Sequence, residues 1–181
     1  MIDAIEERFS IRRFESRPVE REKLIKCVEA ARLAPSAENV QPWRFIIIDD
    51  DDIKEAFGRE VFSGIYRATR WAIKAPVIVV LLADLNFIAH RMAKLFTGIP
   101  YYLLDIGIAG EHFVLQAQDL GLGTCWIGWF DVKKAHRFFK LPKKIRVCEL
   151  MAVGYPDPGM GLKRRKRKSI EEILFFNSWR Y

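Results

Sequence analysis

The distribution of apolar residues along the chain predicts two amphipathic helices. Residues 21–34 carry apolar side chains at helical spacing, and Pro35 ends this segment. Residues 105–120 show a longer apolar stripe, with Asp105 placed as an N-cap and Gly121 just past the last turn. Gly107 and Gly110 lie off this stripe, where small residues allow another backbone to approach closely.

Three short apolar runs predict strands. Residues 43–48 (WRFIII) read as a buried strand, and residues 147–153 form another that the sequence Gly-Tyr-Pro closes. Residues 76–83 (PVIVVLLA) are continuous and rich in β-branched side chains, which is typical of a central strand covered on both faces. Residues 125–127 are predicted to form a short strand or a loop.

The remaining segments predict shorter elements. An acidic turn at 49–52 leads into a helix at 53–57, and residues 87–96 are expected to be helical up to a break at 98–100. Residues 169–175 are expected to form a terminal helical turn or more. Helices and strands alternate without a break in composition, so we expect one domain spanning residues 1–181. Its predicted fold class is α/β or α+β, in three layers with helices on a central sheet.

The composition is that of a globular protein, with 181 residues of which 50% are hydrophobic. The longest apolar run, residues 75–83, is shorter than the roughly 20 residues that cross a bilayer. The chain opens without the apolar region of a signal peptide. Three cysteines with no CxxC pair favour a reducing compartment, and the histidines are isolated, so we expect a cytoplasmic protein with no metal site.

The formal net charge of +7 is concentrated in one place. Residues 163–168 (KRRKRK) carry six positive charges, which leaves +1 for the rest of the chain. A phosphate-binding role competes here with a polyanion-binding patch or a solvated segment. No aromatic residue is interleaved with the run, as binding of single-stranded nucleic acid would favour, so a nucleic-acid partner is a remote alternative.

Three further segments have side chains suited to ligand binding. Arg8, Ser10 and Arg12 alternate, so an extended backbone would direct them to one side, where they suit a phosphate; a solvated basic stretch is the alternative. The loop 35–42 (PSAENVQP) offers amides and a hydroxyl between two prolines, which suits hydrogen bonding to a ligand. The alternative is that this loop is an ordinary connection between two elements. Residues 121–128 (GLGTCWIG) contain three glycines that allow close backbone approach, and Cys125 there is read as a buried thiol.

Taken together and in order, these segments resemble the nitroreductase-like flavoprotein family. Residues 8–14 (RFSIRRF) resemble its R-x-S-x-R-x-F opening, and residues 35–43 resemble its P-S-x-x-N-x-Q-P-W loop. Residues 121–128 resemble its G-L-G-x-C-W-x-G loop, and residues 154–156 with 165–173 resemble its closing segments. Glu38 and Ser169 depart from the family, which usually has a small residue and a proline at these positions.

The resemblance implies a nitroreductase-like fold, α+β with a mostly antiparallel sheet flanked by helices, and a domain-swapped type of homodimer with FMN at the interface. It assigns Arg8, Ser10 and Arg12 to FMN, with Arg8 at the phosphate and Arg12 towards the ring's N1 and O2 edge. The other implied FMN-binding residues are Ser36, Asn39 and Gln41 from the neighbouring subunit, Ile127 and Gly128 near N5, Arg165 and Arg167 at the phosphate, and Arg70 near the ring.

The implied activity is that of an FMN-dependent NAD(P)H oxidoreductase. NADH or NADPH would deliver hydride to the flavin N5 in a ping-pong reaction, and a nitroaromatic, quinone or similar small acceptor would then take the electrons. No side chain need act as a catalytic acid or nucleophile, because the cofactor carries the chemistry. The alternative is a flavin-binding protein with little turnover that serves storage, sensing or a specialised partner.

Overall fold

The computed structural model describes residues 1–85, 98–161 and 166–179. The sequence forms helices where apolar residues recur at helical spacing and strands where they run together. In chain order the elements are α1 (Asp3–Glu7), α2 (Arg21–Arg32), the 3-10 segment η1 (Ala37–Asn39), β1 (Trp43–Ile48), α3 (Asp51–Val61), the 3-10 segment η2 (Gly64–Lys74), β2 (Val77–Asp84), α5 (Tyr101–Asp119), β3 (Gly123–Ile127), α6 (Val132–Phe138) and β4 (Ile145–Gly154).

The four strands form one sheet in the order β1-β2-β4-β3, and every neighbouring pair is antiparallel. Ile46 lies opposite Val80, Val79 opposite Met151 and Cys125 opposite Ala152. Between Leu81 and Leu82 the register of β2 against β4 shifts. The all-antiparallel pairing confirms the α+β class, which the pattern of elements alone left open.

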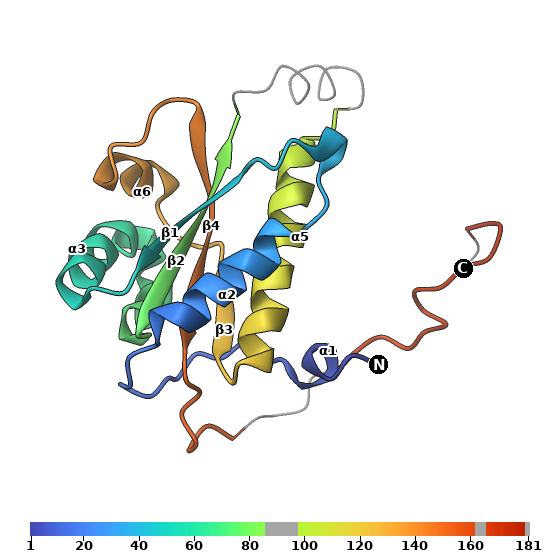
Figure 1. Cartoon of the computed structure of the whole chain (residues 1–181), viewed down its shortest axis with the longest axis horizontal. Coiled ribbons are helices and arrows are strands. Elements are labelled where there is room, and N and C mark those ends of the chain that lie inside the picture. Colours follow the sequence, from blue (N-terminus) through green and yellow to red (C-terminus); the bar gives the residue numbers. More distant parts are fainter. Residues whose placement is uncertain (86–97, 162–165, 180–181) are drawn as a thin grey trace.

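Two apolar cores lie on the two faces of the sheet. On one face Val79 and Leu81 pack with side chains of α2 and α5, and on the other Ile78 and Val80 pack with those of α3, η2 and α6. Figure 1 shows α2 and α5 together on one side of the sheet, with α3 and α6 on the other. Since successive strand residues point to opposite faces, a continuous apolar run is required wherever both faces are covered, and β2 is such a strand.

The predicted strands are present, but one is less buried than expected. Residues 76–83 form the central β2, and residues 147–153 lie within β4. Residues 125–127 belong to β3 and are therefore a strand. Residues 43–48 form β1 as predicted, yet it is an edge strand in which only Trp43 and Ile48 are buried.

The prediction that Asp105 caps a helix is wrong. Helix α5 already begins at Tyr101, after Pro100, so Asp105 lies in its second turn and is 3% exposed. The apolar stripe through Ile106 and Phe113 is buried as predicted. Gly110 faces Trp126 of the same chain, since an added Cβ would collide with that indole ring, whereas Gly107 is exposed.

Several connecting elements differ from the prediction. Helix α3 runs from Asp51 to Val61, with the Asp50 carboxylate accepting a hydrogen bond from the N–H of Ile53. Neither α6 nor η2 was predicted, since neither segment has enough regular apolar spacing. Residues 169–175 form a hydrogen-bonded turn, and the helix expected at 87–96 lies outside the described residues.

The segment before α2 runs along the outer edge of β3. Ser10 forms a parallel bridge with Thr124, and the N–H of Ile11 donates to the Thr124 carbonyl over 2.8 Å. Ile11 is buried against Gly123, where a Cβ would come within 2.5 Å of the Ile11 side chain. A glycine at this position therefore allows the N-terminal segment to pack against the strand.

Candidate functional site

Three arginines of the N-terminal segment have different environments. The Arg13 guanidinium donates to the Asp157 carboxylate over 2.7 Å, so its charge is neutralised within the fold. Arg8 and Arg12 form no ion pair or side-chain hydrogen bond with any residue that the structure describes. The Ser10 bridge to β3 lies between them. Within the described residues, these two guanidinium groups are therefore available for an external anion.

The segment η2 lies beside Arg12, and the loop after β3 packs against η2. The Arg12 guanidinium stands 5.9 Å from the centre of the Trp71 ring, which belongs to η2. The Thr69 hydroxyl donates to the Trp129 carbonyl over 2.6 Å, and the Trp129 indole N–H donates to the Ile65 carbonyl over 3.0 Å. The residues that follow β3 are thus held against η2.

Ile127 and Gly128, also predicted for this region, lie where β3 ends. The Ile127 side chain is 2% exposed, so only the backbone of this residue can meet a ligand. Arg70 lies on η2 and approaches the Glu55 carboxylate to 3.8 Å. We call this group the β3-edge half-site; its members are Arg8, Ser10, Arg12, Arg70, Ile127 and Gly128.

The polar loop before β1 forms a second group. The Ser36 hydroxyl accepts from the N–H of Gln41 over 2.9 Å, and the Gln41 amide donates to the Asn39 side-chain oxygen over 3.1 Å. The fold thus brings together the three predicted residues of this loop, which we call the loop half-site.

The loop half-site has an unusual backbone and a fixed attachment. Glu38, Asn39 and Gln41 have positive φ values of 51°, 54° and 50°, a region that is sparsely populated by residues other than glycine. The N–H of Ala37 donates to the buried Asp105 carboxylate over 3.0 Å, which attaches the loop to α5. Such backbone strain is typical of ligand-binding segments.

A single chain does not bring the two half-sites together. The loop half-site contacts the first turns of α5 through Asp105, whereas Ser10 of the β3-edge half-site is bridged to Thr124 of β3, shortly after α5 ends. Helix α5 has 19 residues, which corresponds to a length of about 28 Å. Figure 1 shows the segment before β1 near one end of this helix and the start of β3 near the other.

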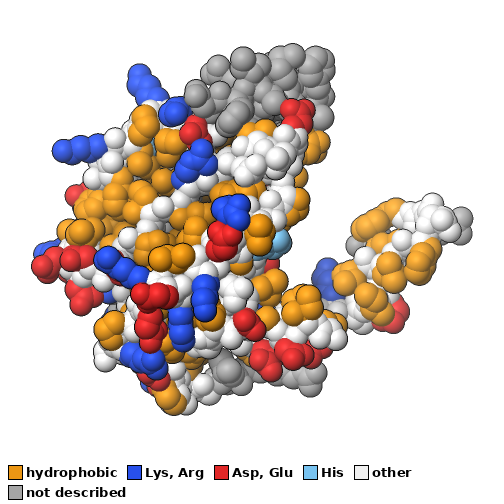
Figure 2. All heavy atoms as spheres, in the orientation of Figure 1, with side chains coloured by type: hydrophobic (Ala, Val, Ile, Leu, Met, Phe, Trp, Pro, Cys, Tyr) orange, Lys and Arg blue, Asp and Glu red, His pale blue; other side chains and the backbone are white. Residues whose placement is uncertain are grey.

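Of the two predicted phosphate ligands near the C-terminus, only Arg167 lies within the described residues. Arg165 lies outside the described residues. Arg167 is exposed, and its guanidinium donates to the Lys166 carbonyl over 3.2 Å. Residues 166–179 project away from the sheet, as Figure 1 shows, and Figure 2 shows hydrophobic side chains gathered on this projecting segment.

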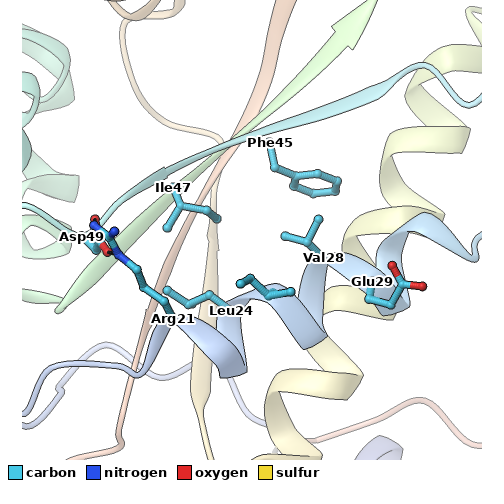
Figure 3. A pocket seen from close by; sticks show the side chains of 8 residues that line it. Arg21, Leu24, Val28, Glu29, Phe45, Ile47 and Asp49 are labelled. Atoms are coloured by element: carbon cyan, nitrogen blue, oxygen red, sulfur yellow. Dashed lines mark hydrogen bonds and ion pairs between the residues drawn. The ribbon is translucent and has the colours of Figure 1, made fainter.

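A groove lies between α2 and the free edge of the sheet. It has a volume of about 450 Å³, and apolar side chains line its floor, including Leu24, Val28, Phe45 and Ile47 (Figure 3). The Arg21 guanidinium binds the Asp49 carboxylate at one end over 2.6 Å, and this contact lowers the pKa of Asp49. Nothing in one described chain covers this edge of β1.

Sequence reasoning missed one polar residue at the β3-edge half-site. Glu149 lies in the middle of the apolar strand β4, next to Gly128, and burial raises the pKa of its carboxyl. A lone acidic residue within an apolar strand was the available signal. Cys125, by contrast, is buried as predicted.

The described helices include none that is long and apolar enough to cross a membrane. Likewise, no group of three or more His, Cys, Asp or Glu side chains placed to hold a metal ion occurs within residues 1–85, 98–161 and 166–179.

Comparison with known proteins gives concordant matches. The model of the Nitroreductase family matches residues 5–155. An NADH dehydrogenase of Thermus thermophilus is 29% identical over 175 residues, covering 82% of this chain and 83% of the relative. A nitroreductase family protein of Clostridium difficile has a TM-score of 0.82 and 26% identity, covering 99% of each chain. An FMN-dependent nitroreductase of Clostridium difficile has a TM-score of 0.73 and 29% identity, covering 99% of this chain and 100% of that one.

Proposed function

The chain belongs to the nitroreductase family of oxidoreductases, and we propose that it binds FMN and passes electrons from NADH or NADPH to a small acceptor. Nitroaromatic compounds and quinones are the acceptor class that we propose. FMN, when bound, supplies the redox chemistry by accepting a hydride and releasing it to an acceptor. The residues of this chain bind the cofactor, orient it and set its electrostatic environment.

One observation carries the proposal: Arg8 and Arg12 lack acidic partners among the described residues, while the neighbouring Arg13 has one. An FMN phosphate carries nearly two negative charges, and guanidinium groups bind phosphate oxygens in a bidentate manner. Glycine at position 128 and the exposed backbone at the end of β3 leave room for a flat ring to approach. The residues present therefore fit the phosphate and one edge of FMN.

The loop half-site supplies complementary chemistry. Its amides and hydroxyl both donate and accept hydrogen bonds, which suits the pyrimidine edge of a flavin. Because the residues of this loop already bond to one another and to Asp105, a ligand would meet an organised surface.

We further propose that the working molecule is a homodimer. The loop half-site lies at the start of α5, and the Ser10 bridge to β3 lies shortly after its end. Two copies of α5 packed side by side in antiparallel orientation would therefore place each loop half-site near the partner's β3-edge half-site. Leu103, Leu104 and Ile108 are exposed on α5 by 47%, 53% and 39%, with the exposed Gly107 between them. This face is apolar enough to be covered by a second copy.

The C-terminal segment supports the same proposal. It exposes a series of large apolar side chains, namely Ile170, Ile173, Leu174, Phe176 and Trp179. The groove beside β1 is apolar and borders an unpaired strand edge, which readily accepts an extended segment. We propose that the C-terminal segment of one copy covers this groove on the other.

The absorption spectrum of the purified protein tests the cofactor. We expect a yellow protein, or a colourless one that becomes yellow on adding FMN, with 1 FMN per chain as the proposed loading. Added NADH or NADPH should bleach the flavin band, and a quinone should restore it. A protein that stays colourless with FMN would disprove the proposal. Bound FMN that neither nicotinamide bleaches would instead indicate a flavin-binding protein with little turnover.

A further inference from the structure

Glu149 lies directly beside the glycine that ends the β3-edge half-site. A Cβ on Gly128 would stand 3.3 Å from the Glu149 Oε2 atom and 3.5 Å from its Oε1 atom. The carboxyl thus occupies the side of Gly128 on which a side chain would project. A Cβ at position 128 would be in tight contact with this carboxyl, which would have to shift by a few tenths of an ångström.

The sheet forms a step at this position. Strand β3 pairs with β4 only as far as Ile127 opposite Leu150, whereas β4 continues to Ile145. Glu149 is therefore the first residue of β4 beyond the end of its neighbour. On the other side of β4, the residue paired with Glu149 is Leu81 of β2. Glu149 therefore lies at the end of the β3–β4 pairing, next to the proposed cofactor site at Gly128.

The carboxyl has no structural role that explains it. It forms no hydrogen bond or ion pair with any residue that the structure describes. Half-buried carboxyl groups without partners are unfavourable when ionised, and burial accordingly raises the pKa of Glu149. An apolar side chain would serve the sheet better at this position.

We propose that Glu149 is a positioning residue of the cofactor site, which supports the Gly128 backbone and sets the charge beside the cofactor edge that Gly128 meets. This inference rests on the proposed binding of FMN. It assigns Glu149 no proton transfer to substrate. Glycine at 128 then leaves room for the ligand on one side and avoids a tight contact with the Glu149 carboxyl on the other.

The charged and titratable surroundings of Glu149 are simple. Cys148 precedes it on β4, and burial raises the pKa of that thiol to about 11. Arg146 lies further along the same strand and donates to the Tyr102 hydroxyl of α5 over 3.2 Å. Leu81 on β2, with Trp126 and Gly128 on the β3 side, brings no charge.

A double-mutant cycle on FMN affinity tests the positioning role. Gly128→Ala, Glu149→Ala and the double variant are titrated with FMN, and the quenching of flavin fluorescence is measured. We expect Gly128→Ala to raise the FMN Kd about tenfold in the native background and less than about threefold beside Glu149→Ala, since contacting residues couple. If Gly128→Ala raised the FMN Kd by the same factor with and without Glu149→Ala, the inference would be overturned. Circular dichroism checks that each variant folds.

The charge effect is tested with Glu149→Gln, which keeps the shape of the side chain. Bound FMN is equilibrated with a reference redox dye from pH 4.5, the ordinary pKa of a glutamate, up to pH 9. Once Glu149 is ionised, its negative charge should disfavour reduced FMN, so the ratio of reduced to oxidised FMN should be about threefold lower in the native protein than in Glu149→Gln at the upper end of this range. Glu22→Gln on α2 is the matched control. Equal ratios at every pH would overturn the inference, whereas absence of FMN binding would overturn the proposed function itself.

Discussion

The carboxylate of Asp105 accepts a hydrogen bond from the backbone N–H of Ala37 over 3.0 Å. This contact joins residues 68 positions apart and attaches the loop half-site to α5. The same helix carries the apolar face that we propose as the subunit interface. Asp105 therefore links the position of the loop to the helix that would place it against a second copy.

Replacing Asp105 by Ala should weaken both stability and cofactor binding. Without the carboxylate, the half-buried N–H of Ala37 loses its acceptor, which costs about 1–3 kcal/mol of unfolding free energy. Asp105→Asn keeps an acceptor oxygen and should lose less. Urea unfolding and FMN titration measure the two effects. If the Asn and Ala variants were equally impaired, the hydrogen bond would not be the cause.

Replacing Glu38 by Gly should stabilise the protein. Glu38 has a φ of 51°, which a side chain disfavours and glycine adopts freely. We expect a gain of about 1 kcal/mol in unfolding free energy. Glu22→Gly, in the helix α2, is the control and should instead lose about 1 kcal/mol. A Glu38→Gly variant less stable than the native protein would contradict the conformational argument.

Arg8→Ala should weaken the binding of FMN much more than the binding of riboflavin, which lacks the phosphate. Loss of a charged hydrogen bond of about 1.5–3 kcal/mol would raise the FMN Kd about 10- to 100-fold. The riboflavin Kd should change little. Arg13→Ala is the matched control, because Arg13 is already paired with Asp157. Fluorescence titration with both flavins measures the effect, and equal losses for the two ligands would rule out a phosphate contact at Arg8.

Leu104→Glu should prevent dimer formation and, with it, FMN binding. The substitution places a charge on the exposed apolar face of α5, where burial against a second copy would be unfavourable. Light scattering after size-exclusion chromatography measures the mass. Ile53→Glu, at an exposed apolar position of α3, is the control and should leave the mass unchanged. A dimeric Leu104→Glu variant that still binds FMN would exclude this interface.

The contact between Tyr155 and Glu20 should contribute to stability in a pH-dependent way. The Tyr155 hydroxyl donates to Glu20 Oε2 over 2.5 Å. This hydrogen bond is the largest of several causes, the Arg17 guanidinium among them, that lower the pKa of Glu20 from 4.5 to about 2. A carboxyl with a lowered folded pKa contributes fully above pH 4.5 and loses its contribution as the pH falls towards 2.

Tyr155→Phe should therefore destabilise the protein most above pH 5, with a difference from the native protein that shrinks as the solution is acidified. Urea unfolding at pH 6, 4 and 3 measures this trend. Tyr66→Phe is the control, since its hydroxyl bonds to no described residue and its ring packs against Trp129. A difference that stays constant across the range would show that the lost effect is packing and not the Glu20 contact.

Local patterns identified most of the secondary structure, because helices and strands have distinct apolar spacing. The central position of β2 followed from its continuous apolar run, since both faces needed cover. The start of α5 was misplaced because Asp105 is a favoured capping residue by type, while its actual partner, Ala37, is distant in sequence. The helix α6 was missed because its seven residues are too few for a periodic signal.

The sequence by itself determined the family, the order of the binding segments and the identity of the polar residues in them, because these depend on residue types at short spacing. Only the tertiary structure decided that Arg13 is neutralised while Arg8 and Arg12 are not, and that Glu149 stands beside Gly128. It also decided that the loop half-site is attached to the start of α5, while Ser10 is bridged to the strand that follows the end of this helix. Such relationships join residues far apart in the chain, and they depend on strand order and side-chain direction, which local spacing does not encode.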